Sequence, residues 1–174
     1  MKMNSIDGQT DKVLYYVERI MQKAWATASK ESISAKTKRS QRIIKLWQFL
    51  CARYLKLKIG NPNTASLEFA VHDKINGIVY ELKATKTNPR TPLYKAVCKA
   101  IAYNKMPNED KIKRLIFIIP QAAKTKIFGK GTNQTIPELL MEGNFAEEAS
   151  LEIICIPCIT YNKKALNNIL GEKL

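Results

Sequence analysis

The sequence has no apolar run of the eighteen or so residues needed to span a bilayer. Its first ten residues, MKMNSIDGQT, lack the apolar core of a secretory signal peptide, so we expect a cytoplasmic protein with no membrane partner. Cysteine is scarce, and Cys51 and Cys98 stand alone in the sequence. The pair Cys155 and Cys158 therefore lacks the second pair that a structural zinc site needs, and we expect all four thiols to be reduced and buried.

Acidic residues are absent from two long stretches, between Glu31 and Glu68 and between Glu81 and Glu109. The net charge is +14 and the isoelectric point is near 9.7, a field that attracts polyanions. Nucleic acid is the expected partner, ahead of an anionic membrane surface or an acidic protein. A surface helix usually interleaves Glu with Lys, so we assign the unbroken basic run before Glu68 to phosphate contacts.

The length of 174 residues, with 45% hydrophobic and 25% charged residues, predicts one globular domain, residues 1–174. Apolar periodicity predicts helices and turn residues predict the connections between elements. In chain order we expect helices at 11–28 and 38–57, a turn cluster at 59–65, a hairpin, a helix at 92–105, a strand at 114–120, a loop at 122–134, a helix from 135, a strand at 151–159 and a helix from 162. This order predicts an α/β fold with a mixed sheet flanked by helices, in which residues 1–60 are helical and 61–174 form the α/β core.

The hairpin, residues 66–85, is the stretch around which we expect the chain to be organised. Asn76-Gly77 suits a tight turn between strands at roughly 67–73 and 78–85. Because successive residues of a strand point to opposite faces, the residues divide into two sets. The core side is expected to hold Phe69, Val71, Tyr80 and Leu82, and the open side Glu68, Ala70, His72, Glu81 and Lys83.

The length of the turn decides which acid accompanies Glu81. A four-residue turn, Lys74 to Gly77, places Glu68 opposite Lys83, one side-chain repeat of roughly 7 Å from the level of Glu81. A two-residue turn leaves Glu68 too far along, and a three-residue turn replaces it by Asp73 and removes apolar residues from the core. We expect the four-residue turn, with Asp73 as the rival first ligand.

Two carboxylates and an ammonium on one strand face call for a cation and an anionic substrate to balance their charges. Hard oxygen ligands with an open shell suit Mg²⁺, which keeps several waters and binds substrate phosphates. Lys83 would then stabilise or help to deprotonate an attacking water. The alternative is an ordinary solvated pair of Glu81 and Lys83 on an exposed strand.

An acid, a short hairpin and then Glu81-Leu82-Lys83 resemble the signature of the PD-(D/E)XK nuclease superfamily, and Glu-Leu-Lys resembles that of small type II restriction endonucleases. The resemblance covers about twenty residues directly, and the loop, helix and apolar strand that follow come in the family's order. The family usually has Asp as its first acid, often after Pro, whereas this chain has Glu68 after Leu67.

The resemblance implies a Mg²⁺-dependent endonuclease on double-stranded DNA, with Glu68 and Glu81 as metal ligands, the Leu82 backbone carbonyl as another and Lys83 as a catalytic residue. The alternatives are a structure-selective resolvase or repair nuclease of the same fold and a non-catalytic DNA-binding module. Cutting both strands needs two centres, so we expect a homodimer. The candidate interface is the apolar stripe of the first helix, with core packing as its alternative role: Val13, Val17, Ile20, Met21 and Trp25. DNA contacts are expected from Lys36, Lys38, Arg39, Arg42, Lys45, Lys86, Asn88, Arg90, Lys95 and Lys99.

Overall fold

The computed structural model describes residues 8–27, 33–60, 67–84, 88–107, 110–120, 123–128 and 151–158. The chain divides into two compact units, one with helices α1 (Gly8–Thr27) and α2 (Ile33–Leu55), the other spanning residues 57–157. This division lies close to the boundary at residue 60 that the sequence predicts between its helical part and its α/β core. Among the helices described, none is long and apolar enough to cross a membrane.

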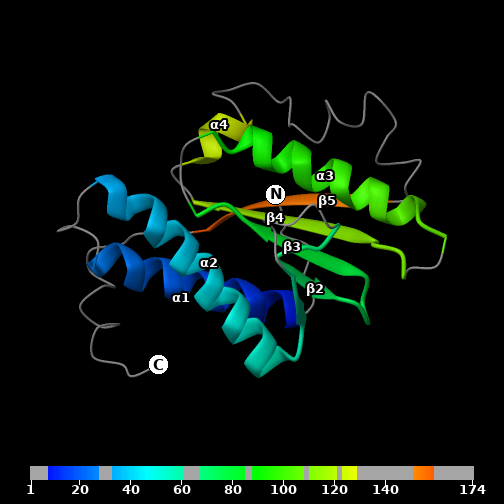
Figure 1. Ribbon diagram of the computed structural model, residues 1–174, viewed down its shortest axis with the longest axis horizontal. Helices are drawn as coiled ribbons and strands as arrows, with labels where there is room; N and C mark the ends of the chain where they lie inside the picture. Colours follow the sequence, from blue (N-terminus) through cyan, green and yellow to red (C-terminus); the bar gives the residue numbers. More distant parts are fainter. Residues whose placement is uncertain are drawn as a thin grey trace. The chain divides into compact units, whose positions relative to one another are not determined.

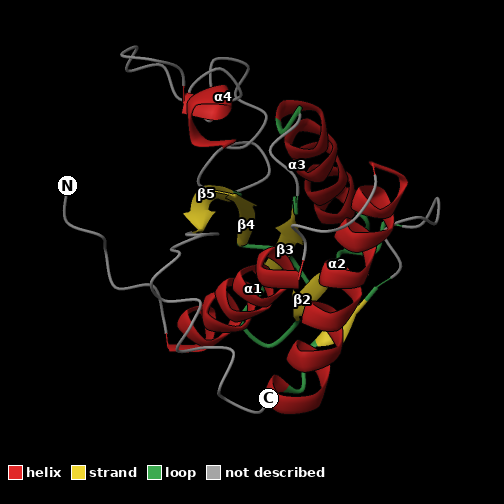
Figure 2. Ribbon diagram, turned by 90° about the vertical axis from the view of Figure 1, so that its left-hand side faces the viewer, coloured by secondary structure: helices red, strands yellow, loops and turns green. Residues whose placement is uncertain are grey.

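Helices α1 and α2 lie side by side and run in opposite directions (Figure 1 and Figure 2). Tyr16, in the middle of α1, stacks on Tyr54, at the end of α2, with 6.0 Å between the ring centroids. On α1 the apolar stripe of Val13, Val17 and Ile20 is fully buried in the chain. Of the two roles expected for these three residues, their burial favours core packing over a dimer interface. The side chains of Met21 and Trp25 lie outside the described part of the structure.

The second unit is built on a five-stranded sheet of order β1-β2-β3-β4-β5. Its strands are β1 (Lys58–Ile59), β2 (Val71–Asp73), β3 (Ile78–Leu82), β4 (Arg114–Pro120) and β5 (Glu152–Cys158). The first three strands pair antiparallel, and β4 pairs parallel to β3, so the predicted mixed sheet is confirmed. A parallel pair needs a crossover connection, and helix α3 (Arg90–Lys105) supplies it between β3 and β4 (Figure 1).

Three elements of the second unit agree with the predicted boundaries, whereas α1 begins three residues and α2 five residues earlier than predicted. Two short elements were not predicted. Strand β4 occupies the expected residues 114–120, and α3 and β5 agree within two residues. Strand β1 overlaps the start of the predicted turn cluster, and only its pairing with β2 makes it a strand. The short helix α4 (Lys124–Phe128) lies where a loop was expected. The helices expected from 135 and from 162 lie outside the described residues.

The hairpin between β2 and β3 has the four-residue turn that we expected. Val71 pairs with Tyr80 and Asp73 with Ile78, which leaves Lys74 to Gly77 as the turn. Gly77 has φ +67°, a conformation that L side chains rarely adopt, and a Cβ there would meet the carbonyl oxygen of Lys111 at 2.8 Å. The carboxylate of Asp73 closes the turn because it accepts from the Asn76 amide at 3.2 Å and from Asn76 Nδ2 at 2.8 Å.

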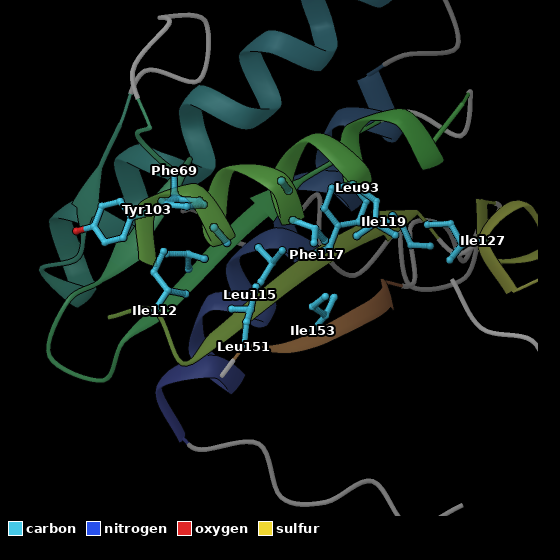
Figure 3. Packing of buried hydrophobic residues seen from close by; sticks show 14 of the residues in the cluster. Phe69, Leu93, Tyr103, Ile112, Leu115, Phe117, Ile119, Ile127, Leu151 and Ile153 are labelled. Atoms are coloured by element: carbon cyan, nitrogen blue, oxygen red, sulfur yellow. The ribbon is translucent and has the colours of Figure 1, made fainter. Parts of the chain in front are cut away.

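The main hydrophobic cluster lies between α3 and one face of the sheet (Figure 3). Val79, Leu115 and Phe117 come from the sheet and pack with Leu93 and its neighbours on α3. Alternation along β3 places Glu81 on the same face as Val79, so this face is not the open one that we expected. The reason is the parallel β3–β4 pair, because its crossover helix covers the face it crosses.

The opposite face of the sheet is also buried, at Val71, Tyr80 and Leu82. Phe69, which we expected beside these residues, belongs instead to the cluster under α3. It precedes β2 and is separated from it by a bend at Ala70, so strand alternation does not extend to it. The predicted core residues are therefore all buried, but Phe69 lies on the other side.

Candidate active site

Glu81 lies in the middle of the sheet, on β3, with its side chain only 14% exposed. The Oε1 atom accepts a hydrogen bond from Lys99 Nζ at 2.5 Å and one from the Ala70 amide at 3.4 Å. A carboxylate in a largely apolar layer needs such compensation, because burial of an unpaired charge costs several kcal/mol. The structure therefore pairs Glu81 with Lys99 under the inner face of α3.

Lys99 provides the cation at this position. Besides Glu81, its Nζ donates to the backbone carbonyl of Glu68 at 2.7 Å and lies 4.5 Å from the ring centroid of Phe69. Lys99 is among the residues expected to contact DNA, but its side chain turns inward to Glu81 and is 19% exposed. Helix α3 delivers this ammonium from eighteen residues further along the chain than Glu81.

Glu68 reaches the same point through its main chain. Its carbonyl oxygen and the Glu81 carboxylate converge on one ammonium, at 2.7 Å and 2.5 Å from Lys99 Nζ. Glu68 also lines a pocket beside this point. Gly60 permits this placement, since a Cβ there would lie 2.5 Å from the Phe69 carbonyl oxygen and 2.7 Å from Glu68 Cβ.

Asp73, the rival of Glu68, is engaged elsewhere. Both of its carboxylate oxygens bond to Asn76 within the hairpin turn, and it is almost completely buried. Strand alternation places it on the opposite face of the sheet from Glu81. Of the two candidate acids, the structure therefore brings Glu68 into the neighbourhood of Glu81 and leaves Asp73 in the turn.

Lys83 and Leu82 follow Glu81 at the end of β3. The Lys83 amide donates to the Ile118 carbonyl at 2.9 Å, so the ladder with β4 continues through this residue. Alternation then places the half-buried Lys83 side chain on the face of Glu81. The Leu82 side chain is buried on the other face.

The residues expected to contact DNA are distributed over both units. On α2, Lys45 is exposed, whereas the side chains of Lys36, Lys38, Arg39 and Arg42 lie outside the described part, as does the whole of Lys86. Asn88 is exposed, with φ 42°, and Lys95 is exposed on α3. Arg90 is exposed too, but its Nε donates to the Lys126 carbonyl at 2.7 Å, which ties the start of α3 to α4.

The cysteines follow the expected pattern in part. Burial raises the pKa of Cys51 and of Cys155 to about 12, so both thiols stay protonated and unreactive at neutral pH. Cys98 is free and exposed on α3, which corrects the expectation of a buried thiol. The side chain of Cys158 lies outside the described residues.

His72 is a candidate functional residue that we did not assign a role from the sequence. It is 5% exposed on β2, and its Nε2 has no hydrogen-bond partner among the described residues. Desolvation lowers its pKa, and the charges of Lys74 and Lys58 lower it further, against smaller opposing effects of Asp73 and Asp110. His72 is therefore a neutral imidazole at pH 7. His72 is the one histidine of the sequence, and this was the signal by which the sequence could have marked it as a candidate functional residue.

A small pocket of about 180 Å³ opens beside His72. It is lined by residues of β1, of the segment before β2, of the hairpin and of the end of α3: Lys58, Gly60, Leu67, Glu68, Phe69, His72, Lys74, Tyr103 and Met106. Within the described ranges, no group of three or more His, Cys, Asp or Glu side chains is arranged to hold a metal ion. The chain matches no protein-family model, no curated protein and no solved structure.

Proposed function

We propose that this protein is a Mg²⁺-dependent endonuclease that hydrolyses phosphodiester bonds in double-stranded DNA, of the type II restriction class. The observation that carries the proposal is the convergence of the Glu81 carboxylate and the Glu68 carbonyl on one cation, the ammonium of Lys99, at 2.5 Å and 2.7 Å. Glu81 lies two residues before Lys83 on the same strand face. Glu81 and Lys83 are residues that the Glu-Leu-Lys resemblance implies. For Glu68 the resemblance implies the carboxylate, whereas the group that meets Lys99 is the Glu68 backbone carbonyl.

The donor atoms around this point fit magnesium. They are oxygens, the hard ligands that Mg²⁺ prefers, and few enough to leave room for water and phosphate. The Lys99 ammonium stands in for a cation there. Glu81 and Glu68, with the Leu82 carbonyl, would hold the ion, which when bound acidifies a water and stabilises charge on the phosphate.

The two lysines would take separate parts in the reaction. Lys83, on the face of Glu81, is placed to orient or deprotonate the attacking water. Lys99, once the ion balances Glu81, is free to turn to a phosphate oxygen, since a lysine side chain is a flexible point charge. The Phe69 ring beneath Lys99 keeps one side of the ammonium dry, which strengthens its attraction to an anion.

Charge and topology supply further support. A net charge of +14 favours a polyanionic substrate and fast encounter with it. The order of antiparallel hairpin, helix α3 and parallel strand β4 is the order that the resemblance implies for the fold. Exposed Lys95 lies four residues before Lys99 on α3, so it extends the positive charge along this helix.

The test is cleavage of supercoiled plasmid and linear duplex by the purified chain, with Mg²⁺ and with chelator. We expect discrete fragments only with Mg²⁺, and a loss of two orders of magnitude or more, about 3 kcal/mol or more of barrier, for Glu81→Gln and for Lys83→Ala. Lys113→Ala, an exposed lysine outside the expected DNA contacts, is the matched control and should keep the cleavage step. Full activity of either variant, measured on folded protein, would refute the proposal.

A second candidate function is a non-catalytic nucleic-acid-binding module. The observation in its favour is that Lys99 already neutralises Glu81, so the site is balanced without a metal. The same assay separates the candidates, because this module binds DNA equally well with Mg²⁺ or chelator and leaves it intact. Cutting of branched DNA with little cutting of linear duplex would point instead to a resolvase or repair nuclease.

A further inference from the structure

The pocket beside His72 has the size of one aromatic ring. Its volume is about 180 Å³, and a cavity of about 150 Å³ in a protein core is known to accept benzene. A six-membered ring with a few exocyclic atoms therefore matches it. A single ring leaves room for its exocyclic groups, a fused two-ring base would fill the pocket more tightly, and an intact base pair is too large to enter.

Three aromatic rings of the lining form one connected group. Phe69 and His72 meet edge to face with centroids 5.9 Å apart, Phe69 and Tyr103 at 5.9 Å, and His72 and Tyr103 at 5.7 Å. Leu67 and Met106 complete an apolar lining. Planar bases stack well on such surfaces and bind them without regard to the rest of a duplex.

The polar groups of the lining suit a phosphorylated ligand. Lys58 and Lys74 are both exposed, and Lys58 lies directly opposite His72 in the β1–β2 ladder. Both residues line the pocket, and their positive charges lower the pKa of His72. Glu68 is the one acid of the lining, and a carboxylate accepts hydrogen bonds from the N–H groups of a base edge.

We propose that this pocket binds a single unpaired pyrimidine nucleotide of a nucleic-acid strand, with the base against Phe69, His72 and Tyr103 and the phosphate at Lys58 and Lys74. The proposal rests on the proposed function, because Glu68 belongs to both sites. Its carbonyl faces Lys99, while the same residue lines the pocket. A strand bound at Glu81 therefore has its neighbouring nucleotide at the pocket, unpaired from its partner in the duplex.

The sole histidine makes the test direct. In the full chain labelled at histidine, the imidazole signals of His72 report on the pocket without further assignment. The probes are dTMP, dCMP, dAMP, thymidine and inorganic phosphate, added without metal at constant pH. We expect saturable shifts with dTMP and dCMP, at least about fivefold tighter than with thymidine, phosphate or dAMP.

Two variants locate the phosphate. Replacing Lys58 and Lys74 together by Gln should weaken dTMP about tenfold and leave thymidine unchanged, since only charged contacts are lost. Lys113→Gln, an exposed lysine outside the lining, is the matched control. No shift with any nucleotide, or phosphate binding as tightly as dTMP, would overturn the proposal. Because the readout is binding without metal, a chain that binds dTMP but cuts no DNA would refute the nuclease and not the pocket.

Discussion

Replacement of Lys99 by Met tests the centre of the site most directly. Met keeps the unbranched stem over Phe69 but removes the ammonium that joins helix α3 to β3. The lost interactions are the bond to Glu81 Oε1 at 2.5 Å, the bond to the Glu68 carbonyl at 2.7 Å and the contact with the Phe69 ring at 4.5 Å. Glu81 would keep only the weaker bond from the Ala70 amide at 3.4 Å.

The expected cost follows from these contacts. A charge-assisted bond contributes about 1.5–3 kcal/mol, but the two side chains are 19% and 14% exposed, so solvent screening reduces the pair to about 1–2 kcal/mol. The cation–π contact adds about 0.5–1 kcal/mol. We therefore expect the free energy of unfolding to fall by about 1.5–3 kcal/mol.

Urea unfolding followed by far-UV circular dichroism measures this loss. With a slope of about 1–3 kcal/mol per molar urea, the midpoint should fall by about 0.5–3 M. Lys95→Met, one turn earlier on α3 and exposed, is the matched control and should change stability by less than about 0.5 kcal/mol. Equal effects of the two variants would refute the buried ion pair.

Magnesium extends the same experiment to the proposed function. Without Lys99 the ion no longer competes with an ammonium for Glu81, so Mg²⁺ should stabilise Lys99→Met more than it stabilises the unchanged chain. Free Mg²⁺ at about ten times its dissociation constant adds about 1.4 kcal/mol. Adding Glu81→Gln to Lys99→Met should abolish this gain. A gain that survives would mean that the ion binds elsewhere.

Four further predictions concern the surroundings of the site. The pKa of His72, measured by NMR, should lie below 6.5, and a value above 6.5 would contradict the burial described here. Because the unfolded chain then binds the proton more tightly than the folded chain, stability should fall as pH falls below 6.5 and level off below the folded pKa. Asn104→Ala should destabilise by about 2–4 kcal/mol in thermal or urea unfolding, because the amide and carbonyl of buried Ile112, each bonded to Asn104 at 2.7 Å, lose their partner; a change below about 0.5 kcal/mol would refute this role. Gly60→Ala should destabilise by about 1–3 kcal/mol, since its Cβ would meet the Phe69 carbonyl oxygen, whereas an unchanged midpoint would show that β1 shifts freely. Maleimide labelling followed by peptide mass spectrometry should modify Cys98 in the folded protein well before Cys51, and comparable rates would contradict the burial of Cys51.

The local pattern of the sequence determined the elements that carry their own signals. The apolar run RLIFIIP is long enough and bounded clearly enough to predict β4 at 114–120. Asn76-Gly77 together with the apolar alternation predicted the hairpin and its four-residue turn, because a three-residue turn would have moved apolar residues out of the core and a two-residue turn would have left Glu68 too far from Glu81. The net charge of the chain and its Glu81-Leu82-Lys83 tripeptide are likewise given by the sequence alone.

Only the tertiary structure decided which face each residue occupies and what it meets there. Alternation sorts β3 into two faces but does not say which one a crossover helix will cover, so the face of Glu81 was expected to be open. The partner of Glu81 is Lys99, which local periodicity placed among outward lysines of α3. Phe69 and His72 meet Tyr103 from the far end of that helix, and β1 exists only by pairing with β2. These contacts join residues that are distant in the sequence, whereas side-chain alternation and secondary-structure propensity act only between near neighbours. The free energy that selects such contacts therefore arises only once the helix has packed on the sheet.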